Sequence, residues 1–246
     1  MRVAVEVCVT SVEEALFAQR AGVDTVEVCS WLASGGVTPS FGLLNVLQEQ
    51  CPIRKRVLVR PTPGGFQYTD VERQVLLRDM MIAGVGDPHC GIVSGGLDAQ
   101  GDPDVGLVKA MLLASAGREF TFHRALDLCT DPLRGFELLM AMHVPRVLTS
   151  GGCSKAIEGA GTLAEFVRRA DARVAVAAAG GITPETVVEL VERTGVQEVH
   201  FAAQRELPHA PQVALSTAPP AAGLFTTPDE AKIEGVLNAL AKAGLR

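Results

Sequence analysis

The sequence predicts a closed (β/α)8 barrel, in which eight parallel strands each lead into a helix. The chain has 246 residues, close to the roughly 250 that are typical of this fold. Strand-like and helix-like segments alternate eight times, which favours a parallel sheet covered by helices. The turn after the first predicted strand, Thr10-Ser11-Val12, lacks the glycines of a doubly wound nucleotide-binding sheet. We expect one barrel domain over residues 1–246, without a linker.

The predicted strands are short, apolar-leaning runs bounded by polar residues, glycine or proline. They cover residues 2–9, 25–30, 56–60, 90–93, 119–123, 144–150, 173–178 and 198–201. The predicted helices carry start and stop signals, such as Ser11 and Glu14 in capping-box spacing and Gly22 as a stop. They cover residues 11–21, 40–50, 69–83, 104–116, 133–142, 162–170, 184–193 and 229–243.

One stretch, residues 204–228, is irregular by composition. It follows the last predicted strand and contains five prolines, which disfavour a regular helix between 208 and 220. It also carries apolar residues such as Val213 and Phe225. We expect it either to cover the carboxyl ends of the strands as a lid, or to pack against the barrel rim or a neighbouring subunit.

Composition argues against several classes of protein. Apolar residues make up 48% and charged residues 20%, enough to build a large core. The net charge of −6, without a basic stripe, argues against a nucleic-acid partner. No apolar run approaches the ~18 residues of a membrane span, and no signal peptide is apparent, so we expect a cytoplasmic protein. The six cysteines form no CxxC pair and are expected to be reduced and mostly buried.

The segment from Thr121 to Asp127 is the most informative part of the chain. A predicted strand ends there in His123, Arg124 and Asp127, which are a titratable base, a fixed cation and a carboxylate. Such groups must be hydrated, paired or bound to a ligand. Because the active sites of barrels lie at the carboxyl ends of the strands, this segment predicts a functional site.

The first two predicted strands share the tripeptide Glu-Val-Cys, at residues 6–8 and 27–29. Alternation places the glutamate and the cysteine of each tripeptide on one face of its strand. Neighbouring parallel strands would then bring Cys8 near Cys29, and Glu6 near Glu27. The alternative is that the cysteines are small core residues and that the glutamates belong to a buried ion network.

Several predicted strands end in polar residues that would meet at the mouth of a barrel. We expect six of them to line one polar cavity: Glu6, Glu27, Arg60, His123, Arg124 and His200. His200 is equally compatible with a hydrogen-bonded core histidine. The Gly180-Gly181 turn after the seventh strand is a weak signal for phosphate binding.

These segments together resemble the CutC family of copper homeostasis proteins. The matching segments are 6–8, 27–30, 35–40, 59–61, 121–125, 148–151, 180–182 and His200. The resemblance implies a (β/α)8 barrel and a cytoplasmic role in copper homeostasis or Cu(I) binding. The chain departs from the family pattern at Arg56, Thr62, Ala178-Ala179 and Ala202-Ala203. The family has an arginine at the position of Thr62, and its loss weighs against an anion site.

Two functions follow from this reading. In the first, the protein handles Cu(I), a copper ion being its cofactor or cargo, and Cys8 and Cys29 are the ligands because Cu(I) prefers thiolates. In the second, it is an enzyme of the lyase or isomerase type that acts on a small anionic metabolite. Arg60 or Arg124 would bind the anion, His123 or Glu27 would move a proton, and Ser150 would orient the substrate. Neither requires nucleic acid or a membrane, and a homo-oligomer is compatible with both.

Overall fold

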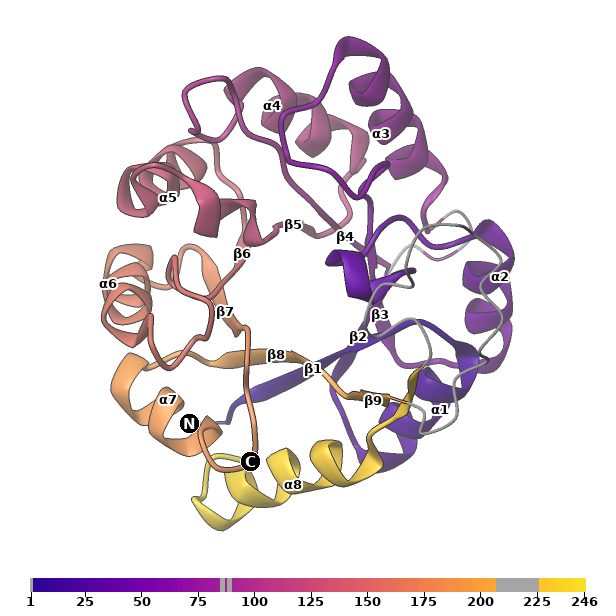
Figure 1. Cartoon of the computed structure of the whole chain (residues 1–246), viewed down its shortest axis with the longest axis vertical. Coiled ribbons are helices and arrows are strands. Elements are labelled where there is room, and N and C mark those ends of the chain that lie inside the picture. Colours follow the sequence, from indigo (N-terminus) through magenta and orange to yellow (C-terminus); the bar gives the residue numbers. More distant parts are fainter. Residues whose placement is uncertain (1, 85–86, 88–89, 207–225) are drawn as a thin grey trace.

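Eight parallel strands close into a barrel in the computed structural model of the chain, which describes residues 2–84, 87, 90–206 and 226–246. The strands pair in chain order, and β8 pairs with β1 to close the ring (Figure 1). The predicted (β/α)8 fold class is confirmed. The strands of the barrel are β1 (Ala4–Val9), β2 (Thr25–Val28), β3 (Arg54–Leu58), β4 (Gly91–Ser94), β5 (Phe120–Phe122), β6 (Arg146–Thr149), β7 (Ala175–Ala179) and β8 (Glu198–Ala202).

A helix follows each strand and covers the outside of the barrel (Figure 1). All eight predicted helices are present, with ends that differ from the prediction by a few residues. The helices are α1 (Val12–Ala21), α2 (Phe41–Gln50), α3 (Asp70–Ile82), α4 (Val105–Ala114), α5 (Pro132–Ala141), α6 (Ala160–Ala170), α7 (Val187–Thr194) and α8 (Glu230–Lys242).

The start of α1 departs from the predicted capping box. The Ser11 hydroxyl accepts a hydrogen bond from the backbone N–H of Glu14 at 3.2 Å, as predicted. The Glu14 carboxylate, however, accepts from the backbone N–H of Thr10 at 2.6 Å and from the Gln204 side chain at 2.9 Å. The reciprocal hydrogen bond of a capping box, from the backbone N–H of Ser11 to Glu14, is therefore replaced. Glu14 instead connects the residues that follow β8 to the start of α1.

Two short 3-10 helices at the mouth were not predicted. They are η1 (Leu32–Ser34), after β2, and η2 (Arg124–Leu128), after β5. The second begins where the His123 ring nitrogen Nδ1 accepts a hydrogen bond from the backbone N–H of Ala125 at 3.3 Å. A histidine that caps the following turn with its imidazole has no distinct sequence signature. The sequence therefore predicted only the end of a strand here.

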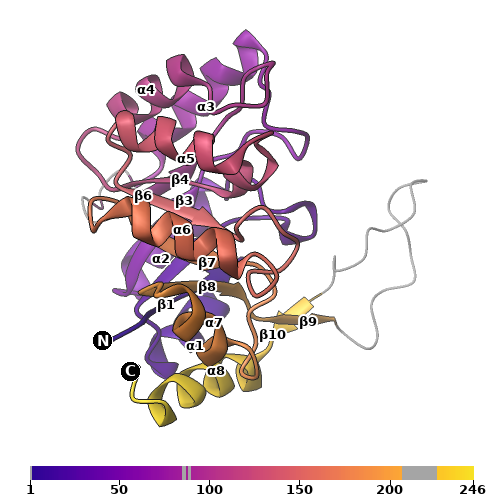
Figure 2. The ribbon, with the colours of Figure 1, turned by 90° about the vertical axis from the view of Figure 1, so that its left-hand side faces the viewer.

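The ends of the stretch 204–228 are more regular than its composition predicted. Gln204–Glu206 forms β9 and Thr226–Pro228 forms β10, and the two pair antiparallel beside the mouth of the barrel (Figure 2). Backbone pairing between these ends overrides their weak strand propensity. The predicted lid segment 213–225 lies outside the described residues.

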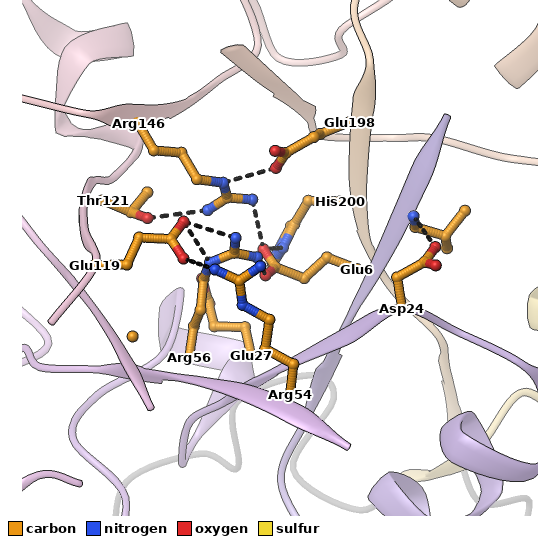
Figure 3. A network of polar contacts seen from close by, with 12 residues as sticks. Glu6, Asp24, Glu27, Arg54, Arg56, Glu119, Thr121, Arg146, Glu198 and His200 are labelled. Carbon is orange, nitrogen blue, oxygen red and sulfur yellow. Dashed lines mark hydrogen bonds and ion pairs between the residues drawn. The ribbon is translucent and has the colours of Figure 1, made fainter. Parts of the chain in front are cut away.

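The barrel interior below the mouth is filled by paired charges, where aliphatic layers are usual. Glu6 of β1 lies between the guanidinium groups of Arg56 from β3 and Arg146 from β6 (Figure 3). Arg56 also pairs with Glu119 at 2.7 Å, and Arg146 with Glu198 at 2.7 Å. These five side chains, here called the ionic floor, tie together strands from both halves of the barrel.

The remaining chemical expectations concern the cysteines and hydropathy. All six thiols are free; five are buried and Cys153 is half-buried, in line with the prediction. Among the described residues, no helix combines the length and the hydropathy that crossing a bilayer requires.

Candidate functional site

A cavity of about 380 Å³ opens at the carboxyl ends of the barrel strands. It lies at the mouth because its lining comes from the last residues of the strands and from the loops that follow them. Five of the six predicted residues line it: Glu27, Arg60, His123, Arg124 and His200. Further lining residues are Cys8, Phe66, Gly180, Phe201 and Lys232, together with several aliphatic side chains.

Glu6 does not line the cavity, so its predicted position was wrong. It precedes Cys8 by two residues on the same face of β1, which places it one layer deeper in the barrel. There it belongs to the ionic floor. Burial alone would raise the pKa of the Glu6 carboxyl, but Arg146, the hydrogen bond with His200 and Arg56 together hold this pKa well below its usual value.

The two Glu-Val-Cys strands are staggered by two residues relative to the predicted register. Cys8 of β1 lies opposite Glu27 of β2, and Glu6 lies opposite Thr25. The stagger is the shear that a closed barrel requires. The sulfur atoms of Cys8 and Cys29 are nevertheless 3.4 Å apart, because Cys29 is the next residue on the same face after Glu27. The predicted proximity of the two thiols is therefore confirmed. Glu6 is close enough to act on the pKa of Glu27, although the two residues are not paired across the strands.

Cys8 also belongs to a second group, with Glu27 and His200. All three residues are buried, and their ligand atoms lie within 4.8 Å of one another. The Cys8 thiol is 3.8 Å from Oε1 of Glu27. The hydrogen bond with Cys29 and burial raise the pKa of the Cys8 thiol well above its usual value. The Cys8–Cys29 pair and the group of Cys8, Glu27 and His200 both have the chemistry to hold a metal ion, and Cys8 belongs to both.

Glu27 is a buried carboxyl group at the wall of the cavity. Its Oε2 atom is buried and has no hydrogen-bond partner. Burial raises the pKa of this carboxyl, and the nearby charge of Glu6 acts in the same direction. A carboxyl with a raised pKa at a cavity wall is suited to proton transfer or to metal binding.

His200 links the cavity to the ionic floor. Its Nδ1 atom is 2.9 Å from Oε1 of Glu6 (Figure 3). Since the Glu6 carboxyl is held ionised, it accepts this hydrogen bond and keeps the proton on Nδ1. In the neutral ring this tautomer leaves a lone pair on Nε2, as in the carboxylate–histidine–metal arrangement.

His123 is a neutral hydrogen-bond donor. Its Nδ1 atom accepts from the backbone of Ala125, so Nε2 carries the proton, and this buried Nε2 atom has no partner. Burial, followed by the charge of Arg60, lowers the pKa of His123 to about 3. A neutral imidazole whose acceptor atom is already engaged is a poor general base. Of the two residues predicted to move a proton, Glu27 fits that role better.

Arg60 and Arg124 differ in how their charges are compensated. Nη1 of Arg60 donates to the carbonyl oxygens of Ser34 at 3.0 Å and Gly36 at 2.9 Å, and burial lowers its pKa. Arg124 is 41% exposed and pairs with Asp127 at 2.8 Å. In the described part of the chain, Arg60 has no carboxylate within 4.0 Å.

Ser150 is not a lining residue, so its predicted role in orienting a substrate is not supported by its position. Its hydroxyl is buried, donates to Asp127 at 2.9 Å and accepts from Arg124 at 2.9 Å. Asp127 also accepts from the backbone N–H of Ser150 at 2.9 Å. This cluster holds the loop after β6 and orients Arg124.

Sequence reasoning missed Lys232 and Phe66. Lys232 lies in the first turn of α8, and its Nζ atom donates to the carbonyl oxygen of Ala202 at 2.7 Å. Nζ also lies 5.6 Å from the centre of the Phe201 ring, and burial lowers the pKa of this lysine. Nothing in the local sequence indicates that the start of the last helix returns to the end of β8. Only the closure of the ring brings them together.

Comparison with known proteins decides the family. The family model for CutC matches residues 3–205. The chain belongs to the CutC family. A human protein described as a copper homeostasis protein CutC homologue is 35% identical over 242 residues, which cover 96% of this chain and 88% of the human protein. A CutC family protein of Xylella fastidiosa is 40% identical over 206 residues, covering 81% of this chain and 74% of the relative.

Solved structures agree with this assignment. A CutC crystal structure from Streptococcus agalactiae superposes with a TM-score of 0.75 at 28% identity and covers 81% of this chain and 98% of its own. Phosphoribosylanthranilate isomerase from Thermotoga maritima matches with a TM-score of 0.59 at 13% identity, covering 98% of this chain and 99% of its own. The second likeness shows the barrel fold alone. The resemblance to CutC seen in the sequence is confirmed, and this chain is a homologue of copper homeostasis proteins.

Proposed function

We propose that this CutC family member binds Cu(I) at the barrel mouth, with Cys8 and Cys29 as ligands. The observation that carries the proposal is the 3.4 Å distance between their sulfur atoms. Two metal–sulfur bonds of about 2.3 Å span up to about 4.6 Å, so one ion can reach both sulfurs after a small displacement. Soft thiolates are the ligands that Cu(I) prefers.

The surroundings of the two thiols support this role. A ring nitrogen of His200 and the carboxyl of Glu27 lie within 4.8 Å of the Cys8 sulfur and can complete the coordination. The raised pKa of the Cys8 thiol means that a metal must displace a proton to bind. The relatives whose names refer to copper homeostasis favour copper over other soft metals.

An anaerobic competition assay with a Cu(I) chelator tests the proposal. Replacing Cys8→Ser together with Cys29→Ser should remove high-affinity binding, because a hydroxyl is a hard ligand. Cys51 and Cys129 are buried thiols away from the cavity, so Cys51→Ser with Cys129→Ser is the matched control and should bind as the unmodified protein does. Equal Cu(I) affinity in the Cys8/Cys29 variant would exclude this site.

A second candidate function is supported by a different observation. Glu27, whose pKa is raised, shares the cavity with the cations Arg60, Arg124 and Lys232. This combination suits an enzyme that abstracts a proton from a small anionic metabolite, as lyases and isomerases do. The test is deuterium exchange from solvent into a panel of small keto acids. Exchange should be lost in Glu27→Gln and retained in Glu189→Gln on the exposed face of α7; the absence of exchange in the unmodified protein would argue against proton abstraction from this class of acid.

A further inference from the structure

We propose that the mouth cavity contains a subsite for a small oxyanion, formed by Arg60, His123 and Lys232. The inference rests on the second proposed function, for which it names the chemical group that is recognised. It is independent of copper, because none of these three residues belongs to the Cys8–Cys29 pair.

Arg60 supplies a buried positive charge that the described residues do not neutralise. Its Nη1 atom is fixed by the carbonyl oxygens of Ser34 and Gly36, and its Nη2 atom by that of Gly64. Nε remains buried without a hydrogen-bond partner. Burying an uncompensated charge is costly. An anion that accepts from Nε–H would offset that cost.

His123 supplies a second donor on the same wall of the cavity. The ring of Phe66 packs against both residues, with its centre 4.6 Å from the centre of the His123 ring and 4.9 Å from the Arg60 guanidinium carbon. Nε2–H of His123 has no partner. With a pKa of about 3, the imidazole stays neutral near pH 7 and keeps this proton. Two N–H groups without a hydrogen-bond partner therefore belong to side chains that both contact the Phe66 ring.

Lys232 adds a charge from the β8 side of the cavity. Its Nζ atom donates to the carbonyl oxygen of Ala202. The charge of Asp229 raises the pKa of this lysine, against the larger lowering effect of burial. Arg124, by contrast, is already paired with Asp127. Arg60 and Lys232 thus bring two positive charges to the cavity that both side chains line.

This pattern specifies the ligand class. A carboxylate or a phosphate group offers two oxygens for the single N–H donors of Arg60 and His123, and its charge suits the two cations. A cavity of about 380 Å³ lies within the range of small-molecule sites, roughly 300–1,000 Å³. The ligand is therefore a small metabolite with an oxyanion group, held with that group against the Phe66 wall.

Calorimetric titration of the copper-free protein, in a buffer without competing anions, tests the subsite with two probes: inorganic phosphate and succinate. We expect saturable binding of at least one probe. Lys232→Gln and Arg60→Gln should each weaken that binding about tenfold or more, as removal of one charge-assisted contact of ~1.4 kcal/mol or more implies. Arg193→Gln, at an exposed arginine on α7 paired with Glu189, is the control and should not change the affinity.

The outcomes separate the alternatives. Preference for phosphate identifies a phosphoryl group, and preference for succinate identifies a carboxylate. Arg60 holds two loops, so Arg60→Gln could impair folding; Lys232, with its one hydrogen bond to Ala202, provides the second test. The subsite is overturned if neither probe binds, or if Lys232→Gln binds both probes as tightly as the unmodified protein. If a probe binds but no proton exchange is seen, the subsite is supported and the enzyme proposal is not. If the probe still binds to the Cys8/Cys29 variant, the subsite is independent of the proposed copper site.

Discussion

His123 shows how the environment of one residue changes the chemistry that its type predicts. A histidine at a strand end suggests a proton carrier with a pKa near neutrality. Here burial lowers that pKa to about 3, and a backbone N–H occupies the acceptor nitrogen. The residue was correctly placed at the cavity from the sequence, but its role as a donor depends on contacts that only the fold supplies.

This lowered pKa makes stability depend on pH in a definite direction. The folded pKa of His123 lies below the reference value of 6.5, so the unfolded chain takes up a proton first and stability falls as the pH drops below about 6.5. Between pH 6.5 and 4.5 the loss attributable to His123 is about 2 kcal/mol, at 1.36 kcal/mol per pKa unit. Urea unfolding should be measured at several pH values for the unmodified protein and for His123→Gln, whose side chain cannot titrate. The difference between the two plots of unfolding free energy against pH gives the contribution of His123. Parallel profiles would contradict the prediction.

Other residues mark the limits of sequence reasoning at this scale. Cys8 and Cys29 could be placed together because alternation along neighbouring strands is local. The depth of Glu6 could not be predicted without the shear of the barrel, and the buried bonds of Ser150 depend on Asp127 from another loop. The place of Lys232 could not be predicted, because its approach to the cavity depends on where the last helix packs.

At the scale of the element, β1 connects two layers of the barrel through one face. Cys8 points into the cavity, while Glu6, two residues earlier, joins the ionic floor and also contacts His200. The strand therefore places the Glu6 carboxylate beside a side chain that lines the cavity, His200. This arrangement makes Glu6 a positioning residue for His200.

We expect Glu6→Gln to release the tautomer of His200. An amide can donate as well as accept, so it no longer keeps the proton on Nδ1, and Nε2 loses its fixed lone pair. Nitrogen-15 NMR of the ring should show mixed tautomers, and Cu(I) affinity should fall about tenfold, the lower end of the effect of removing a residue that orients a metal ligand.

Glu198→Gln provides the matched control. Glu198 pairs with Arg146 in the same ionic floor at 2.7 Å, and none of its described contacts reaches His200. Both variants should lose stability, because each leaves a buried arginine with one carboxylate fewer. A His200 tautomer that stays unchanged in Glu6→Gln would show that the ring is fixed by other contacts.

At the scale of the whole molecule, the fold was the most predictable feature. Eightfold alternation of strand and helix, with residues that start and stop each helix, sufficed for the barrel and for the carboxyl ends as the place of the site. The register of β1 against β2 and the pairing of β9 with β10 arise from closure and long-range hydrogen bonds. These depend on the assembled ring, and no local pattern encodes them.

The ionic floor also decides how anything bound at the mouth can leave. Glu6, Arg56 and Arg146 are buried, and Glu6 pairs with both arginines across the barrel interior, so a layer of paired charges lies beneath the mouth cavity. A ligand bound in the mouth cavity would leave through the same opening by which it entered. If Cu(I) binds at Cys8 and Cys29 as proposed, a recipient protein would have to reach the mouth of the barrel and take the ion there by exchange of ligands.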